Sequence, residues 1–388
     1  MNSLMVNIFF FTLHLHMLAN GITEDYFGLY DTQKNPTVIT TPTPLNNYSN
    51  GTLTPTQIEL GQSSCRYSGN HHPNDTACYV DAFEISKLPT NECTSYIYDG
   101  ITCTDDSKIV PNYSPDDLKN IKSLTNFSSK VFLFYGRLNL SIWTSENFND
   151  SIETEAQNLK EFLDEYPVVG LILTGINYPV LTDNFYIEFQ SYVACIKNKN
   201  PKIKIGLYLR ASTMTYIKNE TEWFDFSKLN DIMDFYLITF NYFNDCSEEL
   251  YNGGTTPLHS DNPNIITLEE FGASLNVSKI AKEKVYLEFM ITPTTIIFDE
   301  RNYLHCEISF DQYCKTDIKS KWCADNETTF YEKGVFARQY AAGWVGRDID
   351  LVDRGGSCGC NGDQFISFHM ILDAYNNKTM RTCDFKKG

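Results

Sequence analysis

The fold is decided by one stretch of the chain, which reads Val168-Val169-Gly170-Leu171-Ile172-Leu173-Thr174-Gly175-Ile176-Asn177-Tyr178-Pro179. It is an apolar run that follows a helical pattern and ends in a polar, aromatic and proline corner. A continuous apolar run of this length is typical of a parallel strand that is buried on both faces. We therefore predict a buried strand over 168–174 whose end opens into a loop.

Apolar runs of the same kind alternate with helical patterns from residue 78 onward. The expected strands span 78–83, 95–99, 131–135, 168–174, 203–209, 235–240, 285–291 and 343–349. A helix start is expected at Ser114-Pro115-Asp116-Asp117, where a capping serine precedes a proline and two acids. Eight such units predict an α/β fold, a parallel (β/α)8 barrel of the TIM type. A doubly wound open sheet is the alternative, but no glycine-rich phosphate-binding turn follows a strand.

The net charge and the cysteine content limit the classes to which the protein can belong. The 388-residue chain has a formal net charge of −18, which argues against nucleic acid or an anionic membrane as a partner. Residues 1–21 are predicted to be a secretory signal peptide, and no later run is long and apolar enough for a membrane span. Twelve cysteines are typical of an exported, extracellular protein with structural disulfides. Cys358 and Cys360 are too close for a zinc pair, so neither a metal site nor a cofactor is predicted.

Between the signal and the barrel lies a Pro/Thr-rich segment, residues 22–64, with few apolar side chains to bury. It is predicted to be disordered, either O-glycosylated or an ordinary flexible tail. Residues 65–388 then form the barrel domain. Asn-x-Ser/Thr sequons predict heavy N-glycosylation at Asn47, Asn50, Asn74, Asn126, Asn139, Asn149, Asn219, Asn276, Asn326 and Asn377. An eleventh sequon, at Asn112, is set aside because Pro115 follows its serine.

Several segments resemble motifs of the family 18 glycoside hydrolases, the chitinases and chitinase-like proteins. Residues 168–179 resemble the signature of their fourth strand, hydrophobic-Asp-Gly-x-Asp-x-Asp-x-Glu-Tyr-Pro, with one extra residue at Gly175. Residues 130–139 resemble Lys-Val-x-x-x-x-Gly-Gly-Trp-Asn, and 238–241 resemble Met-Thr-Tyr-Asp. Residues 343–350 resemble Gly-x-x-x-Trp-Ser-x-Asp. The resemblance extends from about residue 78 to residue 376 and implies the same barrel.

The residues that carry chemistry in that family are absent from the matching positions. Ile172 and Thr174 stand where acids would be, and Asn177 stands where the Glu before Tyr-Pro would be. Phe240 and Asn241 replace the Tyr and Asp of the sixth strand. In active members the Glu protonates the leaving oxygen while an Asp supports the N-acetyl group that attacks the anomeric carbon. The resemblance therefore implies a barrel without hydrolase chemistry.

Strand alternation and the resemblance together mark the candidate binding residues. The alternation of side chains along a strand predicts that one face of the fourth strand carries Gly170, Ile172, Thr174 and Ile176. Leu138 and Arg347 stand where the family has tryptophans, the second of which forms the floor of the central sugar subsite. The candidate ligand-binding residues are Tyr135, Tyr178, Asn241, Tyr242, Arg347 and Asp348, with Trp344 as a further aromatic platform. The resemblance also implies a disulfide between Cys78 and Cys93, for which Cys103 is the competing partner of Cys78.

We expect a secreted, monomeric and catalytically inactive chitinase-like protein. Its partner would be either a glycan containing N-acetylglucosamine or another protein, and the lost tryptophans favour the protein. The alternative is an active glycosidase with relocated acids, for which the candidates are Glu288, Asp348 and Asp350. The competing interpretation of these acids is a salt bridge, most simply from Asp348 or Asp350 to Arg347.

Overall fold

The computed structural model describes residues 75–80, 88–89, 92–112, 114–137, 152–176, 184–220, 224–294, 309–315, 322–352, 356–358, 360 and 362–383. The predicted signal peptide and the Pro/Thr-rich segment lie outside these residues and remain predictions. Within the described parts of the chain, no helix combines the length and apolar character that crossing a bilayer requires.

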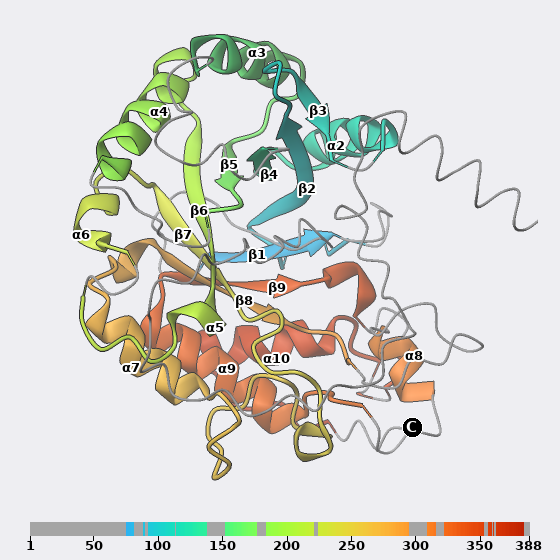
Figure 1. Cartoon of the computed structure of the whole chain (residues 1–388). Coiled ribbons are helices and arrows are strands. Elements are labelled where there is room, and N and C mark those ends of the chain that lie inside the picture. The colour runs from blue at the N-terminus through green and yellow to red at the C-terminus, as the bar shows by residue number, and fades with distance from the viewer. Residues whose placement is uncertain are drawn as a thin grey trace, which may run out of the picture. The chain divides into compact units, whose positions relative to one another are not determined.

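Eight parallel strands form a closed barrel with helices around it (Figure 1). The barrel strands are β1 (Asp75–Val80), β2 (Ser95–Cys103), β4 (Val131–Arg137), β5 (Gly170–Leu173), β6 (Lys204–Arg210), β7 (Phe235–Thr239), β8 (Val285–Met290) and β9 (Gly343–Arg347). Each strand pairs in parallel with the next, and β1 pairs with both β2 and β9, which closes the ring. The predicted (β/α)8 barrel is confirmed.

Strand limits differ from the expected ones by a few residues. The last strand ends at Arg347 instead of 349, because Asp348 adopts a left-handed φ of 58° that is incompatible with extended backbone. The second strand is longer than expected and continues past a register shift to Cys103. Its extension pairs antiparallel with β3 (Ile109–Pro111), a short strand that the apolar pattern did not predict.

The helices cover the outside of the barrel (Figure 1). They are α2 (Asp116–Phe127), α3 (Ile152–Glu165), α4 (Phe185–Lys199), α5 (Ala211–Met214), α6 (Phe226–Leu229), α7 (Leu268–Val277), α8 (Phe310–Lys315), α9 (Glu327–Tyr340) and α10 (Ile366–Tyr375). The predicted start near Ser114 is present, since the Ser114 hydroxyl accepts a hydrogen bond from the Asp116 N–H at 3.1 Å. At the start of α7, Thr267 and Glu270 form a reciprocal capping box.

Two apolar cores stabilise the barrel. The interior is filled by Ala77, Ile97, Phe132, Phe134, Ile172, Phe235, Leu237, Tyr286 and Val345. On the opposite face of β5, Leu171 and Leu173 belong to the core between strands and helices, so this strand is buried on both sides as predicted. Gly170 leaves room for the ring of Phe132, which a Cβ at that position would overlap. Because apolar rings fill the middle, a site can lie only at the ends of the barrel.

Three disulfides connect the loops near the end of the chain. They join Cys246 to Cys323, Cys314 to Cys358 and Cys360 to Cys383. Cys93 also takes part in a disulfide, but the side chain of Cys78 lies outside the described residues, so the predicted pair remains a prediction. Cys103 and Cys195 are free thiols. Cys103 is therefore not the partner of Cys78, and not every cysteine is paired.

Candidate functional site

A cluster of polar side chains lies inside the barrel where β6 to β9 end. These are the carboxyl ends of the strands, where enzymes of this fold place their active sites. Glu288 of β8 is fully buried and accepts hydrogen bonds at Oε1 from Thr239 Oγ1 at 2.8 Å and from Tyr208 Oη at 3.4 Å. The cluster brings together three neighbouring strands that are far apart in sequence.

Arg347 neutralises the centre of this cluster. Its Nη1 lies 3.2 Å from Glu288 Oε1, and its Nε lies 3.5 Å from Asp348 Oδ2. Arg347 and Asp348 are each only 2% exposed. Two carboxylates therefore face one guanidinium in a buried site, which is the environment in which charges persist only when they are paired.

The predicted salt bridge between Asp348 and Arg347 is confirmed, and a second one to Glu288 accompanies it. The left-handed backbone of Asp348 turns the chain sharply at the end of β9, next to Arg347. The side chain of Asp350 lies outside the described residues. Both described acids that could have served as relocated catalytic groups are thus engaged with Arg347.

The end of β5 has no acid in its described part. Ile172 points into the apolar interior, and Thr174 donates hydrogen bonds to the carbonyl oxygen of Tyr135 from its N–H at 3.0 Å and from its hydroxyl at 3.4 Å. The expectation that Ile176 continues the inward face is wrong, because Gly175 has a φ of +92° that breaks the alternation. Ile176 instead joins the core under the helices. Asn177 and Tyr178 lie outside the described residues, as does Leu138.

Tyr135 is not a ligand platform, contrary to the prediction. It is fully buried on the helix side of β4, and its hydroxyl donates to Glu155 Oε1 of α3 at 2.5 Å. The same carboxylate accepts from Tyr192 of α4 at 2.6 Å and forms an ion pair with Arg137. Burial, and then the neighbouring Tyr192 and Glu155, hold the pKa of Tyr135 well above its usual value. This buried polar cluster joins β4, α3 and α4, and no local pattern in the sequence predicts it.

Phe240 and Trp344 also face the helices instead of a ligand. The ring of Phe240 stacks on Phe289 of β8 at 5.0 Å between centroids, and its edge meets Phe271 of α7 at the same distance. Trp344 is fully buried 4.8 Å from Phe368 of α10. The inward residue at this end of β7 is Thr239, and Phe240, which the resemblance matched to a tyrosine, packs towards the helices. These strands are apolar on both faces, and no alternation in the sequence shows which side chains point inward.

One exposed tyrosine follows the end of β7, and a second lies beyond α5. Tyr242, a predicted binding residue, follows β7, and Tyr216, which sequence reasoning missed, follows α5 after β6. Each is 53% exposed, and each has a left-handed backbone, with φ of 52° and 67°. A bulky residue in this conformation costs about 1–3 kcal/mol, and such strain is common at binding sites. Asn241 lies beside Tyr242 and donates its N–H to Thr239 Oγ1 at 3.0 Å.

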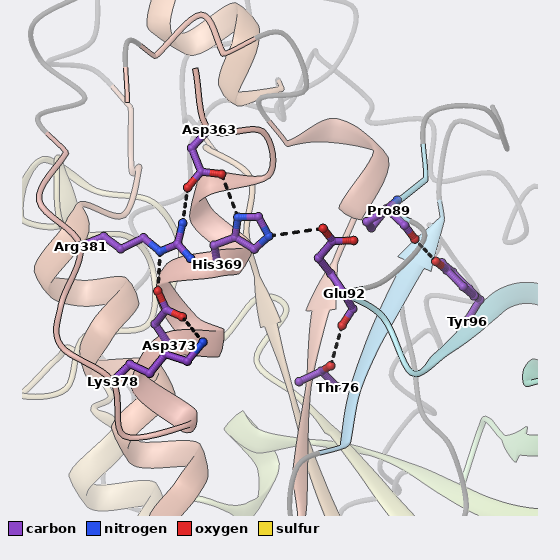
Figure 2. Close-up of polar contacts among 9 residues, drawn as sticks. All are labelled: Thr76, Pro89, Glu92, Tyr96, Asp363, His369, Asp373, Lys378 and Arg381. Atoms are coloured by element: carbon purple, nitrogen blue, oxygen red, sulfur yellow. Dashed lines mark hydrogen bonds and ion pairs between the residues drawn. The ribbon is translucent and has the colours of Figure 1, made fainter. Parts of the chain in front are cut away.

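A separate cavity of about 420 Å³ lies between the β1–β2 connection and the start of α10. Leu88, Pro89 and Phe365 form its apolar wall. In Figure 2, His369 projects between two carboxylates, with Nδ1 3.1 Å from Asp363 and Nε2 3.8 Å from Glu92.

The charged groups beside this cavity attach the end of the chain to α10. Arg381 bridges Asp363 and Asp373, and Lys378 adds a contact of 3.2 Å to Asp373 (Figure 2). Among the residues that the structure describes, no group of three or more His, Cys, Asp or Glu side chains could hold a metal ion. Because Arg381 and Lys378 connect the last described residues to α10, we interpret the network as a structural clamp, and we place the candidate site at the carboxyl ends of the strands.

Comparison of the sequence with known proteins gives no assignment. No family model matches the chain, and no curated protein matches it. The class of the protein consequently rests on its fold, a (β/α)8 barrel whose polar cluster lies at the carboxyl ends of β6 to β9.

Comparison of the structure finds chitinases and chitinase-like proteins as neighbours. Catalytic domain 2 of the Group II chitinase from Ostrinia furnacalis has a TM-score of 0.58 at 14% identity, over 79% of this chain and 94% of that one. The chitinase TsES1 from Trichuris suis, described as an immunomodulatory active chitinase, has a TM-score of 0.57 at 15% identity, over 76% and 94%. Human YKL-39, described as a pseudo-chitinase with retained chitooligosaccharide binding, has a TM-score of 0.54 at 14% identity, over 76% and 94%. These likenesses show a shared fold.

Proposed function

We propose that this protein is a secreted chitinase-like protein without hydrolase activity, which acts by binding a partner at the carboxyl-end rim of its barrel. The observation that carries the proposal is the buried pairing of Arg347 with Glu288 and Asp348. The three disulfides support export, since such bonds persist in oxidising compartments.

Chemistry argues against hydrolysis at this position. Substrate-assisted cleavage needs a proton donor at the glycosidic oxygen and a negative group beneath the forming positive charge. General acid catalysis contributes about 10²–10⁴-fold, and electrostatic stabilisation usually contributes more. The aligned positions offer Ile172, Thr174 and Asn177 in place of acids. A guanidinium at Arg347 would oppose the positive charge that develops on the sugar.

Burial also argues against a sugar on the family's central floor. Arg347 is 2% exposed and its guanidinium is committed to two carboxylates, so its face is not open to a ring. Binding is left to the rim, where Tyr242 is 53% exposed and Asn241 adds a half-buried amide. Exposed tyrosines suit both sugar stacking and protein contacts, because each ring offers an apolar face and a polar hydroxyl.

Between the two kinds of partner we favour a protein. The family's tryptophans at positions 138 and 347 are replaced by leucine and arginine, which removes two stacking surfaces for a chitin chain. Tyrosine is enriched at the centres of protein interfaces, and Tyr242 is exposed on this rim. Glycan binding is the second candidate, favoured by the pseudo-chitinase among the structural neighbours.

A glycosidase with relocated acids is disfavoured by geometry. A general acid must reach the glycosidic oxygen and must be able to carry a proton. Glu288 is fully buried and Asp348 nearly so, and both are paired with Arg347, so neither is placed to reach a glycosidic oxygen.

A binding experiment tests the proposed role. The secreted protein would be applied to chitin beads and to a glycan array, and in parallel used as bait on cells of its own organism. We expect little retention on chitin and a cell-surface protein partner whose binding falls at least tenfold in Tyr242→Ala. Met380→Ala, at an exposed apolar residue beyond the end of α10, is the matched control and should bind normally. Strong retention on chitin that Tyr242→Ala abolishes would establish the glycan partner instead. Equal loss of binding in both variants would contradict the placement of the binding site at the rim.

A further inference from the structure

Apart from the one at Asn112, the sequons in the described part of the chain fall into two structural groups. Asn126, Asn219, Asn276 and Asn377 are exposed, whereas Asn326 is partly buried and its side chain is built into the fold. We propose that the first four carry N-linked glycans on the amino-end face of the barrel and that Asn326 stays unmodified. This inference rests on the export that is part of the proposed function.

Asn326 is the N-cap of α9. Its Oδ1 accepts hydrogen bonds from the backbone N–H groups of Thr328 at 2.9 Å and Thr329 at 3.1 Å. Its Nδ2 donates to the carbonyl oxygen of Asn252 at 2.7 Å, in the loop that follows β7. Both ends of the amide are therefore used, one to start the helix and the other to hold a neighbouring loop.

N-glycosylation would compete with this arrangement. The modification forms a bond between Nδ2 and the anomeric carbon of a lipid-linked oligosaccharide, and it breaks the bond from that carbon to the lipid pyrophosphate oxygen. The amide nitrogen gives up one proton to a base and keeps one. A sugar at Nδ2 would have to fit beside the carbonyl of Asn252, which lies 2.7 Å from that nitrogen, and beside the first turn of α9.

The chain directly before Asn326 is held by a buried ion pair and by a disulfide. Asp325 is buried in an ion pair with Lys333, whose Nζ lies 2.5 Å from its Oδ2. Cys323 is joined by a disulfide to Cys246. A glycan at Asn326 would thus require the helix cap, the loop contact and the adjoining buried pair to rearrange together.

The four exposed asparagines lie where helices end. Asn126 and Asn276 are in the last turns of α2 and α7, and Asn377 follows the end of α10, where its Oδ1 accepts from Arg338 Nη1 at 2.9 Å. Asn219 precedes Glu220, whose carboxylate lies 3.7 Å from the ammonium of Lys279, just beyond the end of α7.

Helix ends of this kind belong to one face of the barrel. In a (β/α)8 barrel each helix returns antiparallel to the strands, so its carboxyl end lies beside the amino ends of the strands. The hydroxyl of Tyr375, at the end of α10, donates to the carbonyl of Ala342, directly before β9, at 2.7 Å. Glycans at these four sites would cover the face opposite to Tyr242 and leave the rim accessible. Asn47, Asn50, Asn74, Asn139 and Asn149 lie outside the described residues and are not part of the inference.

Site-resolved glycopeptide mapping of the full chain, secreted from eukaryotic cells, tests the inference. Enzymatic deglycosylation in heavy-oxygen water would mark each occupied asparagine. Two matched variants remove one sequon each: Thr379→Ala for Asn377 and Thr328→Ala for Asn326. Thr328 serves the cap through its backbone N–H, which alanine keeps.

We expect occupancy at Asn126, Asn219, Asn276 and Asn377, the loss of one glycan in Thr379→Ala and no change of glycan mass in Thr328→Ala. An occupied Asn326, with a glycan lost in Thr328→Ala, would overturn the inference while leaving export intact. Four bare asparagines on a chain glycosylated elsewhere would also overturn it. A secreted chain without any N-glycan overturns it too, and a chain that is not secreted at all refutes the export on which it rests.

Discussion

Arg347 Nη1 lies 3.2 Å from Glu288 Oε1 across neighbouring strands of the barrel, and both side chains are buried where a sugar-binding floor is expected. Asp348 approaches the same guanidinium from the other side. A charge at such a position persists only with its partners, because the interior solvates it poorly. Arg347 therefore fixes two acids in place at this end of the barrel.

Removing the guanidinium should destabilise the fold strongly. In Arg347→Leu, Glu288 and Asp348 would remain buried without their cation, a change that typically costs about 3–5 kcal/mol. Urea unfolding followed by circular dichroism measures the loss. Lys119→Ala, which removes an exposed pair with Asp116, is the control and should leave the midpoint unchanged. A loss below about 1 kcal/mol in Arg347→Leu, the range of surface pairs, would contradict the buried pairing.

The stability of the protein should fall in alkali. Burial, reinforced by the charge of Glu155, raises the pKa of the Cys103 thiol from 9.0 to about 12. The folded pKa is the higher one, so the stabilisation is complete below about pH 9 and is lost as the pH rises towards 12. Unfolding free energies measured across this window should decline, and they should decline less steeply in Cys103→Ala. Equal slopes in the two proteins would show that the thiol is not buried as described.

The disulfide between Cys360 and Cys383 should hold the end of the chain to the barrel. It closes a loop across 23 residues, and a cross-link of that span contributes about 3 kcal/mol. The double variant Cys360→Ser, Cys383→Ser should therefore unfold at lower denaturant and release its C-terminal residues to proteases. Cys195→Ser removes a free thiol and serves as the control. Equal midpoints for the two variants would show that the charged contacts of Arg381 hold the tail alone.

Much of the fold could be predicted from the sequence, because continuous apolar runs such as 168–174 are typical of parallel strands that are buried on both faces. The pairing of Asp348 with Arg347 was also predictable from adjacent opposite charges at a strand end. The same apolar runs do not show which side chains face inward, so Tyr135 and Trp344 were predicted as ligand platforms although both belong to the core beneath the helices. The cluster of Glu155 with Tyr135 and Tyr192 joins three separate elements, and no local pattern marks it.

The most direct test of the account is an activity assay with a fluorogenic N-acetylglucosamine oligomer and with chitin oligosaccharides. The purified protein should show no turnover above a mock-purified control. Asn177→Glu should recover little activity, since the assisting carboxylate and the aromatic floor would still be absent. Clear turnover that is abolished by Glu288→Gln or by Asp348→Asn would contradict the account, because it would identify a working acid in the cluster that Arg347 is proposed to silence.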